Sequence, residues 1–199
     1  MTLTAESLAM VRTAADRLRI LTRPDELCLL AVSGGSDSLA MLDLLHNGAE
    51  SHGRSLAVAH VDHGIDPASE RVAATVAYAA SARGLRFYCR RLELAAATSE
   101  TRARTARRAA LGAMAREAGA AAVVLAHTAD DQAETVLLRV LRGSGPAGLA
   151  AMAARRGRWV RPLLAIRRVQ LMEHLAARGI EALSDPANAD RRHLRSWLR

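Results

Sequence analysis

The sequence predicts an α/β fold, a parallel sheet with helices on both faces, and two observations support this prediction. Three short segments, 27–32, 56–59 and 121–126, are apolar at every position. A strand is apolar throughout when both of its faces are buried. Segments with helical spacing of apolar residues alternate with these runs, and such alternation indicates βαβ units with right-handed crossovers.

The other elements follow in chain order. A first helix is expected over 5–20 and a break at Pro24. Further helices are expected at 39–45, 69–83, 98–118, 130–141 and 167–178, a third and more exposed strand at 87–92, and a short extended piece at 159–164. In the last helix, Val169, Met172 and Leu175 are expected to face the interior.

The length of 199 residues suits one compact domain. We expect a single catalytic domain over 1–199, with a core at about 25–145 and a helical extension at about 146–199. Cys28 and Cys89 are far apart and lie in apolar runs, so buried thiols are expected rather than a zinc or iron–sulfur site. With no signal pattern and no span-length apolar run, the chain is predicted to be soluble and cytoplasmic, without a membrane partner.

The charge is strongly positive: 28 basic residues against 20 acidic ones give a net charge of +8. All 28 are arginines. A GC-rich genome explains the residue type but not the surplus of positive charge. A surplus of this size suits a polyanionic partner such as RNA.

A polar turn follows the first strand and precedes a helix. Its residues are Ser33, Gly34, Gly35, Ser36, Asp37 and Ser38. Consecutive glycines allow close backbone approach to a ligand, and successive N–H groups at a helix N-terminus can hold phosphate oxygens. Asp37 would repel bare phosphate, so it indicates a divalent cation between the two. The alternative is an ordinary Gly-Ser turn with a capping serine.

Polar residues also follow the second and fourth strands, and ligands of parallel sheets bind beyond the carboxyl ends of strands. His60 and His127 are expected at two such ends; a lone histidine is more often structural, but a pair favours contact with a ligand. Asp130 and Asp131 follow His127. The structural alternative is that Asp130 caps the next helix and Asp131 favours its dipole.

These motifs resemble, in order and spacing, those of the tRNA(Ile)-lysidine synthetases, a family of PP-loop ATP pyrophosphatases. The matching segments are the turn 33–38, HVDHG at 60–64, HxxDDQxET at 127–135, RGSG..GL at 142–149, RPLL at 161–164 and DPAN at 185–188. Ordered matches from about residue 27 to the end make coincidence a poor explanation. The resemblance implies a Rossmann-like PP-loop ATPase fold.

The resemblance also implies an activity, that of a ligase. In this family ATP activates C2 of the wobble cytidine of an isoleucine tRNA, and the amino group of free lysine displaces AMP to form lysidine. AMP and pyrophosphate are released. The implied cofactors are ATP and Mg²⁺, and the implied partners are tRNA(Ile) with a CAU anticodon and free lysine. A homodimer is left open.

The resemblance assigns roles to residues of this chain. The expected catalytic residues are Asp37, Asp130 and Arg104. The residues expected to bind the nucleotide are Ser33, Gly34, Gly35, Ser36, Asp37, Ser38, His60 and His127, with Asp37 also holding the metal. Those expected to bind lysine or tRNA are Asp130, Asp131, Arg107 and Arg142. Candidate contacts with RNA phosphates also include Arg155, Arg156 and Arg158.

The sequence departs from the family pattern at a few positions, which are Ile65, Asp66, Arg108 and Ser196. Asp66 replaces a positive charge near the expected site. The C-terminal domains that help family members hold tRNA are expected to be absent, and whether the chain is truncated or minimal stays open. Two alternatives remain: another PP-loop enzyme, such as a tRNA thiolase or an amidotransferase-type synthetase, and a non-enzymatic RNA-binding remnant.

Overall fold

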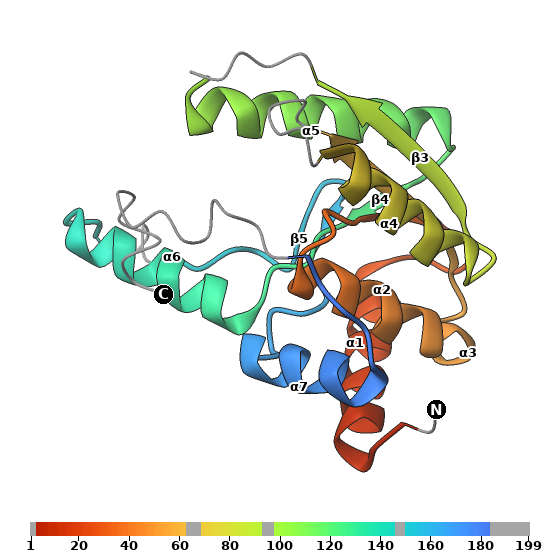
Figure 1. Ribbon diagram of the computed structural model, residues 1–199. Helices are drawn as coiled ribbons and strands as arrows, with labels where there is room; N and C mark the ends of the chain where they lie inside the picture. Colours follow the sequence, from red (N-terminus) through yellow and green to blue (C-terminus); the bar gives the residue numbers. More distant parts are fainter. Residues whose placement is uncertain (1–2, 63–68, 93–97, 146–149, 184–199) are drawn as a thin grey trace.

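A six-stranded sheet forms the centre of the computed structural model, which describes residues 3–62, 69–92, 98–145 and 150–183. The strands are β1 Leu27–Ala31, β2 Ser55–Asp62, β3 Arg86–Arg91, β4 Ala122–Val124, β5 Arg155–Arg156 and β6 Trp159–Val160. Their order is β3-β2-β1-β4-β6-β5, and all pairs are parallel except β5 with β6. The predicted α/β fold class is confirmed (Figure 1).

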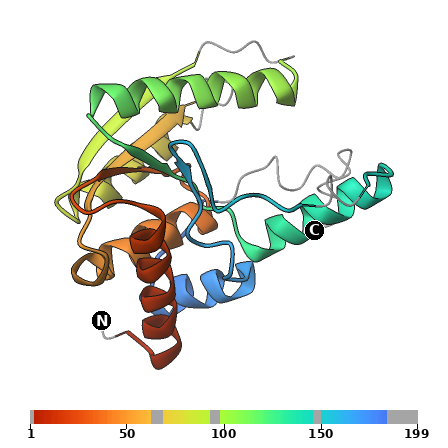
Figure 2. The ribbon, with the colours of Figure 1, turned by 180° about the vertical axis from the view of Figure 1, so that it is seen from behind.

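Helices cover both faces of this sheet. The described helices are α1 Ala5–Leu21, α2 Ser36–Asn47, α3 Ala49–His52, α4 Ser69–Ser81, α5 Glu100–Glu117, α6 Ala129–Leu141 and α7 Arg168–Arg178. Residues of α5 pack on one face, and residues of α1, α2, α4 and α7 pack on the other. Figures 1 and 2 show α5 on the side of the sheet opposite α1 and α7. None of the described helices is long and apolar enough to cross a membrane.

β1 explains why a uniformly apolar run predicts a central strand. Cys28 and Leu30 point into the layer that contains α1, α2 and α7, whereas Leu29 and Ala31 point into the layer that contains α5. Successive side chains of a strand alternate between faces. Both faces of β1 are therefore buried, which explains why the strand is apolar at every position.

The structure differs from the expected elements in several places. β2 continues to Asp62, so His60 lies inside the strand rather than at its end. Two short strands, β5 and β6, extend the sheet. β6 lies within the extended piece expected at 159–164, whereas β5 was not expected. In α7, Leu175 is buried as expected, but Val169 and Met172 are 47% and 55% exposed. The helix instead buries Leu171 and His174. Burial of the polar His174 is possible because both of its ring nitrogens have hydrogen-bond partners, Ser7 and Asp43.

The buried partner of His174 is Asp43 of α2, which is 1% exposed. Its carboxylate accepts hydrogen bonds from His174 Nε2 at 3.0 Å, Arg83 Nη2 at 2.7 Å and Arg178 Nε at 3.2 Å. Burial alone would raise the pKa of Asp43, but these bonds outweigh it and hold the pKa far below its usual range. The network joins α2 to α7 and to the end of α4.

The turn after β1 contains a glycine with a special conformation. Gly34 has φ +91°, and a Cβ added there would lie 2.8 Å from Val72 Cγ1 of α4. Gly35 has φ −75°, and its Cβ would meet only Ser33 Oγ, at an ordinary 3.7 Å. The fold therefore requires glycine at position 34 but not at position 35.

Gly34→Ala is expected to destabilise the protein by at least ~1–2 kcal/mol, the cost of a positive φ for an L-residue, with the overlap on Val72 in addition. Gly35→Ala is the matched control and should change stability by less than ~1 kcal/mol. Urea unfolding of both variants measures the difference. Equal stability of the two variants would contradict the analysis of this turn.

Asp43→Asn is expected to lower the free energy of unfolding by about 3 kcal/mol or more, because it removes the buried charge that pairs with the half-buried Arg83 and Arg178. The contribution of the ionised Asp43 is present above the unfolded pKa and is lost as the pH falls through the lower folded pKa. Asp16→Asn breaks an exposed pair with Arg19 and should cost less than ~1 kcal/mol. Denaturant titrations at neutral pH compare them, and similar losses in both would refute a buried network.

Candidate active site

The reversal of strand order at β1 creates the candidate site. β2 lies on one side of β1 and β4 on the other, so the chain leaving β1 and the chain leaving β4 diverge from adjacent strand ends. Open α/β sheets bind ligands at such a point. The turn 33–38 and the segment 127–131, which are almost a hundred residues apart in the sequence, meet there because their strands are hydrogen-bonded neighbours.

Ser38 braces the glycine turn. Its Oγ accepts the N–H of Ser33 at 3.1 Å and donates to the carbonyl of Gly35 at 2.8 Å. Ser38 is 5% exposed, whereas Ser33 is exposed and Ser36 is half-buried at the start of α2. The first N–H groups of a helix have no intrahelical partner. The turn therefore presents backbone donors and two hydroxyl groups at the carboxyl edge of the sheet.

The start of α6 gives each predicted aspartate a partner within the chain. Thr128 is the N-cap residue, which corrects the reading of Asp130 as the cap. Asp131 Oδ2 accepts the N–H of Thr128 at 2.8 Å and completes a capping box. Asp130 Oδ2 accepts the backbone N–H of Arg168 at 2.7 Å. Asp130 thus ties the start of α7 to the start of α6.

The side chain of Arg168 connects the two halves of the site. Its Nε donates to Asp37 Oδ2 at 3.0 Å, its Nη2 donates to Asp131 Oδ1 at 3.0 Å, and its Nη1 lies 3.5 Å from Glu134 Oε1. Burial opposes the charge of Arg168, but the bond to Asp37 and the nearby carboxylates outweigh it and raise the pKa of the guanidinium. We call Asp37, Asp131, Glu134 and Arg168 the acidic cluster.

Sequence reasoning missed two members of the acidic cluster. The signal for Glu134 was its place as the glutamate of the HxxDDQxET match. It lies one helical turn after Asp130 and Asp131, so the three side chains share one side of the helix. Arg168 carried no such signal, since it opens a helix that follows the RPLL match by three residues. Only the fold brings α7 to this edge of the sheet.

The two predicted histidines are both neutral at pH 7. His60 is 3% exposed, and its Nδ1 lies 2.9 Å from the carbonyl of Val32, so it links β2 to the chain leaving β1. Burial lowers the pKa of His60, partly opposed by that bond. Burial also lowers the pKa of His127, to about 4; Asp131 opposes this, and Arg161, Arg104 and Arg107 add to it.

Arginines line the side of the site that faces α5. The charges of Arg104 and Arg107 reach His127, and that of Arg107 also reaches His60. Arg161, which sequence reasoning named only within the RPLL match, follows β6 and is 7% exposed. Arg142 is not part of this group, because it caps the far end of α6, a helix of 13 residues or about 20 Å, and is exposed.

The remaining arginines predicted to contact RNA have mixed surroundings. Arg156 is exposed, Arg155 lies 3.7 Å from Glu26 in an ion pair, and Arg158 donates to the carbonyl of Gly112 at 3.4 Å. Several predicted motif residues lie outside the described residues: His63, Gly64, Ile65, Asp66, 146–149, 185–188, Arg195 and Ser196.

The carboxylate of Asp37 at the turn fits a magnesium ion that is bound together with the phosphates of a substrate. In the described parts of the chain, no group of three or more His, Cys, Asp or Glu side chains is arranged to hold a metal by itself. Mg²⁺ usually keeps several waters and binds through one or two carboxylates together with substrate phosphates. Asp37, at the first turn of α2 beside Ser33 and Ser36, supplies one such carboxylate.

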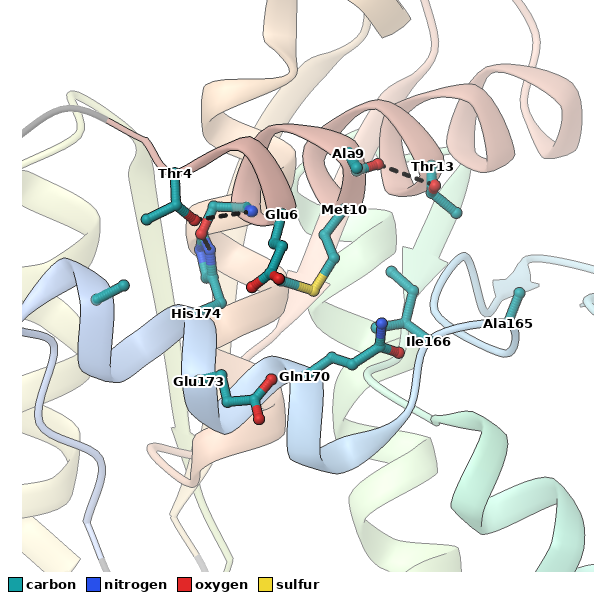
Figure 3. Close-up of a pocket in the computed structure, with 12 residues that line it drawn as sticks. Thr4, Glu6, Ala9, Met10, Thr13, Ala165, Ile166, Gln170, Glu173 and His174 are labelled. Atoms are coloured by element: carbon teal, nitrogen blue, oxygen red, sulfur yellow. Dashed lines mark hydrogen bonds between the residues drawn. The ribbon is translucent and has the colours of Figure 1, made fainter.

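A groove of about 420 Å³ lies elsewhere, between α1 and α7 (Figure 3). Its lining contains Glu6, Glu173 and His174 but no arginine. Carboxylates repel phosphate, and none of the predicted site residues reaches this groove. The carboxyl edge of the sheet therefore remains the candidate site.

A comparison with protein families matches residues 9–199 to the PP-loop domain, a family of ATP-binding domains. The tRNA(Ile)-lysidine synthase of Novosphingobium aromaticivorans is 44% identical over 178 residues, 85% of this chain and 54% of that protein. That of Thermobifida fusca is 44% identical over 196 residues, 96% of this chain and 60% of that protein. The chain thus spans little more than half the length of these curated relatives.

Solved structures share the fold at low sequence identity. The U34-tRNA thiolase of Methanococcus maripaludis has a TM-score of 0.79 and 17% identity, covering 96% of this chain and 70% of its own. The NMN synthetase of Francisella tularensis has a TM-score of 0.55 and 14% identity, covering 88% and 70%. Because the family match extends over nearly the whole sequence, from residue 9 to residue 199, this chain belongs to the PP-loop domain family.

Proposed function

We propose that the protein is a tRNA(Ile)-lysidine synthase, which uses ATP to join free lysine to C2 of the wobble cytidine of tRNA(Ile) with a CAU anticodon. The cytidine is first adenylated with release of pyrophosphate, and the lysine amine then displaces AMP. The observation that carries the proposal is the arrangement at the carboxyl edge. The turn 33–38 contributes Asp37 to the acidic cluster, and the charges of Arg104 and Arg107 of α5 reach His127, which follows the neighbouring strand β4.

The nucleotide is proposed to lie at the turn 33–38. The N–H groups that open α2 and the hydroxyls of Ser33 and Ser36 are preorganised donors for phosphate oxygens. Asp37 would hold Mg²⁺, which when bound offsets negative charge on the leaving pyrophosphate. The lowered pKa values keep His60 and His127 neutral near the turn. Neutral histidines add no positive charge that would slow the release of pyrophosphate.

The lysine amine is proposed to approach from the acidic cluster. Carboxylates attract an ammonium group, and one of them can accept the proton that the amine loses before it attacks C2. Asp131 of this cluster and the adjacent Asp130 can fulfil this role only if their carboxylates are held in place. The backbone and side chain of Arg168 hold both of them, so Arg168 is assigned as a positioning residue.

The tRNA is proposed to lie against the α5 side, where arginine charge is concentrated. Arg104 and Arg107 would contact phosphates near the wobble nucleotide, and Arg142, at the far end of α6, would contact a more distant part of the RNA. The surplus of positive charge over the chain agrees with a polyanionic substrate.

Sulfur transfer is less well supported, although a tRNA thiolase shares the fold. Cys28 lies in the core, where burial is the main cause that raises the pKa of its thiol to about 11. Cys89, on β3 at one edge of the sheet, is exposed, which corrects the expectation of a buried thiol, although partial desolvation still raises the pKa of its thiol. Neither thiol forms a ready thiolate, and the two lie on strands separated by β2.

The proposed activity is tested by incubating the full chain with ATP, lysine and the isoleucine tRNA, followed by nucleoside mass analysis. Lysidine should form, and AMP release should need both lysine and tRNA. Asp37→Asn should lower the rate at least about a hundredfold, whereas Asp16→Asn, on the exposed face of α1, should not. AMP release that ignores lysine and tRNA, a thiolated product, or RNA binding without turnover would each reject the proposal.

Arg168→Met is expected to lower kcat at least about tenfold, equivalent to ~1.4 kcal/mol, because Asp37 and Asp131 lose the group that orients them. Arg178→Met is a matched control on the same helix. The two side chains are similarly exposed, at 22% and 20%, and both pair with carboxylates. Both variants should lower the melting temperature, but only Arg168→Met should lower kcat. A loss of kcat in proportion to stability in both variants would contradict the positioning role.

A further inference from the structure

Arg161 is a buried cation with no acidic partner among the residues that the structure describes. Arg161 is 7% exposed. Its Nη1 donates to the carbonyl of Ala153 at 2.8 Å, but its buried Nε has no hydrogen-bond partner. Burying an unpaired charge is unfavourable, so a protein that keeps one usually supplies it with a counter-ion. The described chain supplies none.

Strand pairing places Arg161 on the α5 side of the carboxyl edge. β4 and β6 pair Val124 with Val160, and the N–H of Leu125 donates to the carbonyl of Val160 at 2.8 Å. Arg161 therefore lies level with Leu125, two residues before His127. Residues two apart in an extended chain share a face, so Arg161 lies on the face of Trp159, which packs with the α5 layer.

α5 brings a second arginine over the same position. Arg108 lies 4.2 Å from the centre of the Trp159 ring. α5 connects β3 to β4 and runs opposite to the strands, so Arg104, one helical turn earlier, is nearer to the carboxyl edge. One turn of about 5.4 Å nearly equals two strand residues of about 6.6 Å. Arg104 therefore faces Arg161 much as Arg108 faces Trp159.

The electrostatics agree with this placement. Burial lowers the pKa of Arg161, and the like charges of Arg108, Arg104 and Arg156 lower it further. The charges of Arg161, Arg104 and Arg107 also reach His127, opposed by Asp131, and the Nδ1 of His127 is buried without a hydrogen-bond partner in the described structure. A neutral imidazole can donate from Nδ1. These donors surround a position that suits an anion.

We propose that Arg161, Arg104 and Nδ1 of His127 form an anion subsite that binds a phosphate group at the carboxyl end of β6. It is separated from the glycine turn by one strand, because β4 lies between β1 and β6. Two sources carry this chemistry, the α-phosphate of a nucleotide held at the turn and a phosphodiester of an RNA strand. The choice of these sources rests on the proposed function, whereas phosphate binding itself does not require lysine transfer.

The first test measures thermal stability with Arg161→Met in the full chain. Without added anions, Arg161→Met should melt at the wild-type temperature or higher, since it removes an unpaired buried charge. Inorganic phosphate should raise the melting temperature of the wild type at constant ionic strength, and Arg161→Met should lose at least half of this shift. Arg116→Met, on the exposed far end of α5, is the matched control and should keep it. A lower melting temperature with an unchanged phosphate shift would assign Arg161 a structural role and overturn the proposal.

The source of the phosphate is resolved by titrating AMP and a short uridine oligonucleotide separately. If Arg161→Met weakens AMP binding at least fivefold and leaves the oligonucleotide unchanged, the subsite takes the nucleotide phosphate. The reverse result assigns the subsite to RNA. The slope of log binding constant against log salt concentration should then be smaller by about one for Arg161→Met. Unchanged binding of both would overturn the proposal. These binding experiments succeed or fail independently of lysidine formation.

A second readout follows His127 by NMR, with His127→Gln to assign its signal. In the free protein the ring should titrate near pH 4. Phosphate at the subsite screens the surrounding arginines, so its presence should move this titration upward by at least one pH unit. Arg161→Met should raise the starting value and reduce the phosphate-dependent movement. An imidazole signal that does not respond to phosphate would exclude His127 from the subsite.

Discussion

The site depends on the reversal of strand order at β1. Because β2 pairs on one side of β1 and β4 on the other, the two chains that leave this pair must turn away from each other. The opening between them holds the glycine turn, the start of α6 and the start of α7. A different crossover would leave the same residues on separate edges of the sheet, where their spacing in the sequence would have no chemical meaning.

The opening has opposite charges on its two sides, and the two layers of helices explain this. α2 and α6 contribute the carboxylates around Arg168 of α7, and α5 contributes arginines whose charges reach His127 and Arg161. The separation allows an anion and an ammonium group to approach the same turn from opposite directions. α7 is held at its other end by Asp43, so the position of the acidic side is also fixed by a buried network in the core.

The sequence predicts the central sheet well because burial on both faces leaves a simple pattern in 27–32, 56–59 and 121–126. It also predicts the turn 33–38, whose residue types have few other uses. His60 was placed outside β2 because a histidine is polar, yet its Nδ1 is satisfied by the carbonyl of Val32 inside the sheet. Periodicity did not resolve the face of α7, since Val169 and Met172 share its spacing with the buried residues.

The residues that sequence reasoning missed are those that act across layers. Arg161 was named only as part of the RPLL match and Arg168 by no pattern, and the importance of both comes from contacts with segments far away along the chain. No local pattern encodes an arginine that pairs with Asp37, 131 positions earlier. Such contacts follow from the packing of α7 and β6, which sequence patterns of this length do not specify.

The basic residue of the acidic cluster is an arginine, Arg168, and this choice affects which side chains could act as nucleophiles. A guanidinium stays protonated at every pH at which the protein is folded and has no free electron pair on nitrogen. Arg168 can therefore neutralise the carboxylates without ever competing as a nucleophile. This sequence contains no lysine. Under the proposed function, no lysine side chain of this sequence could therefore compete with the free amino acid for the activated cytidine.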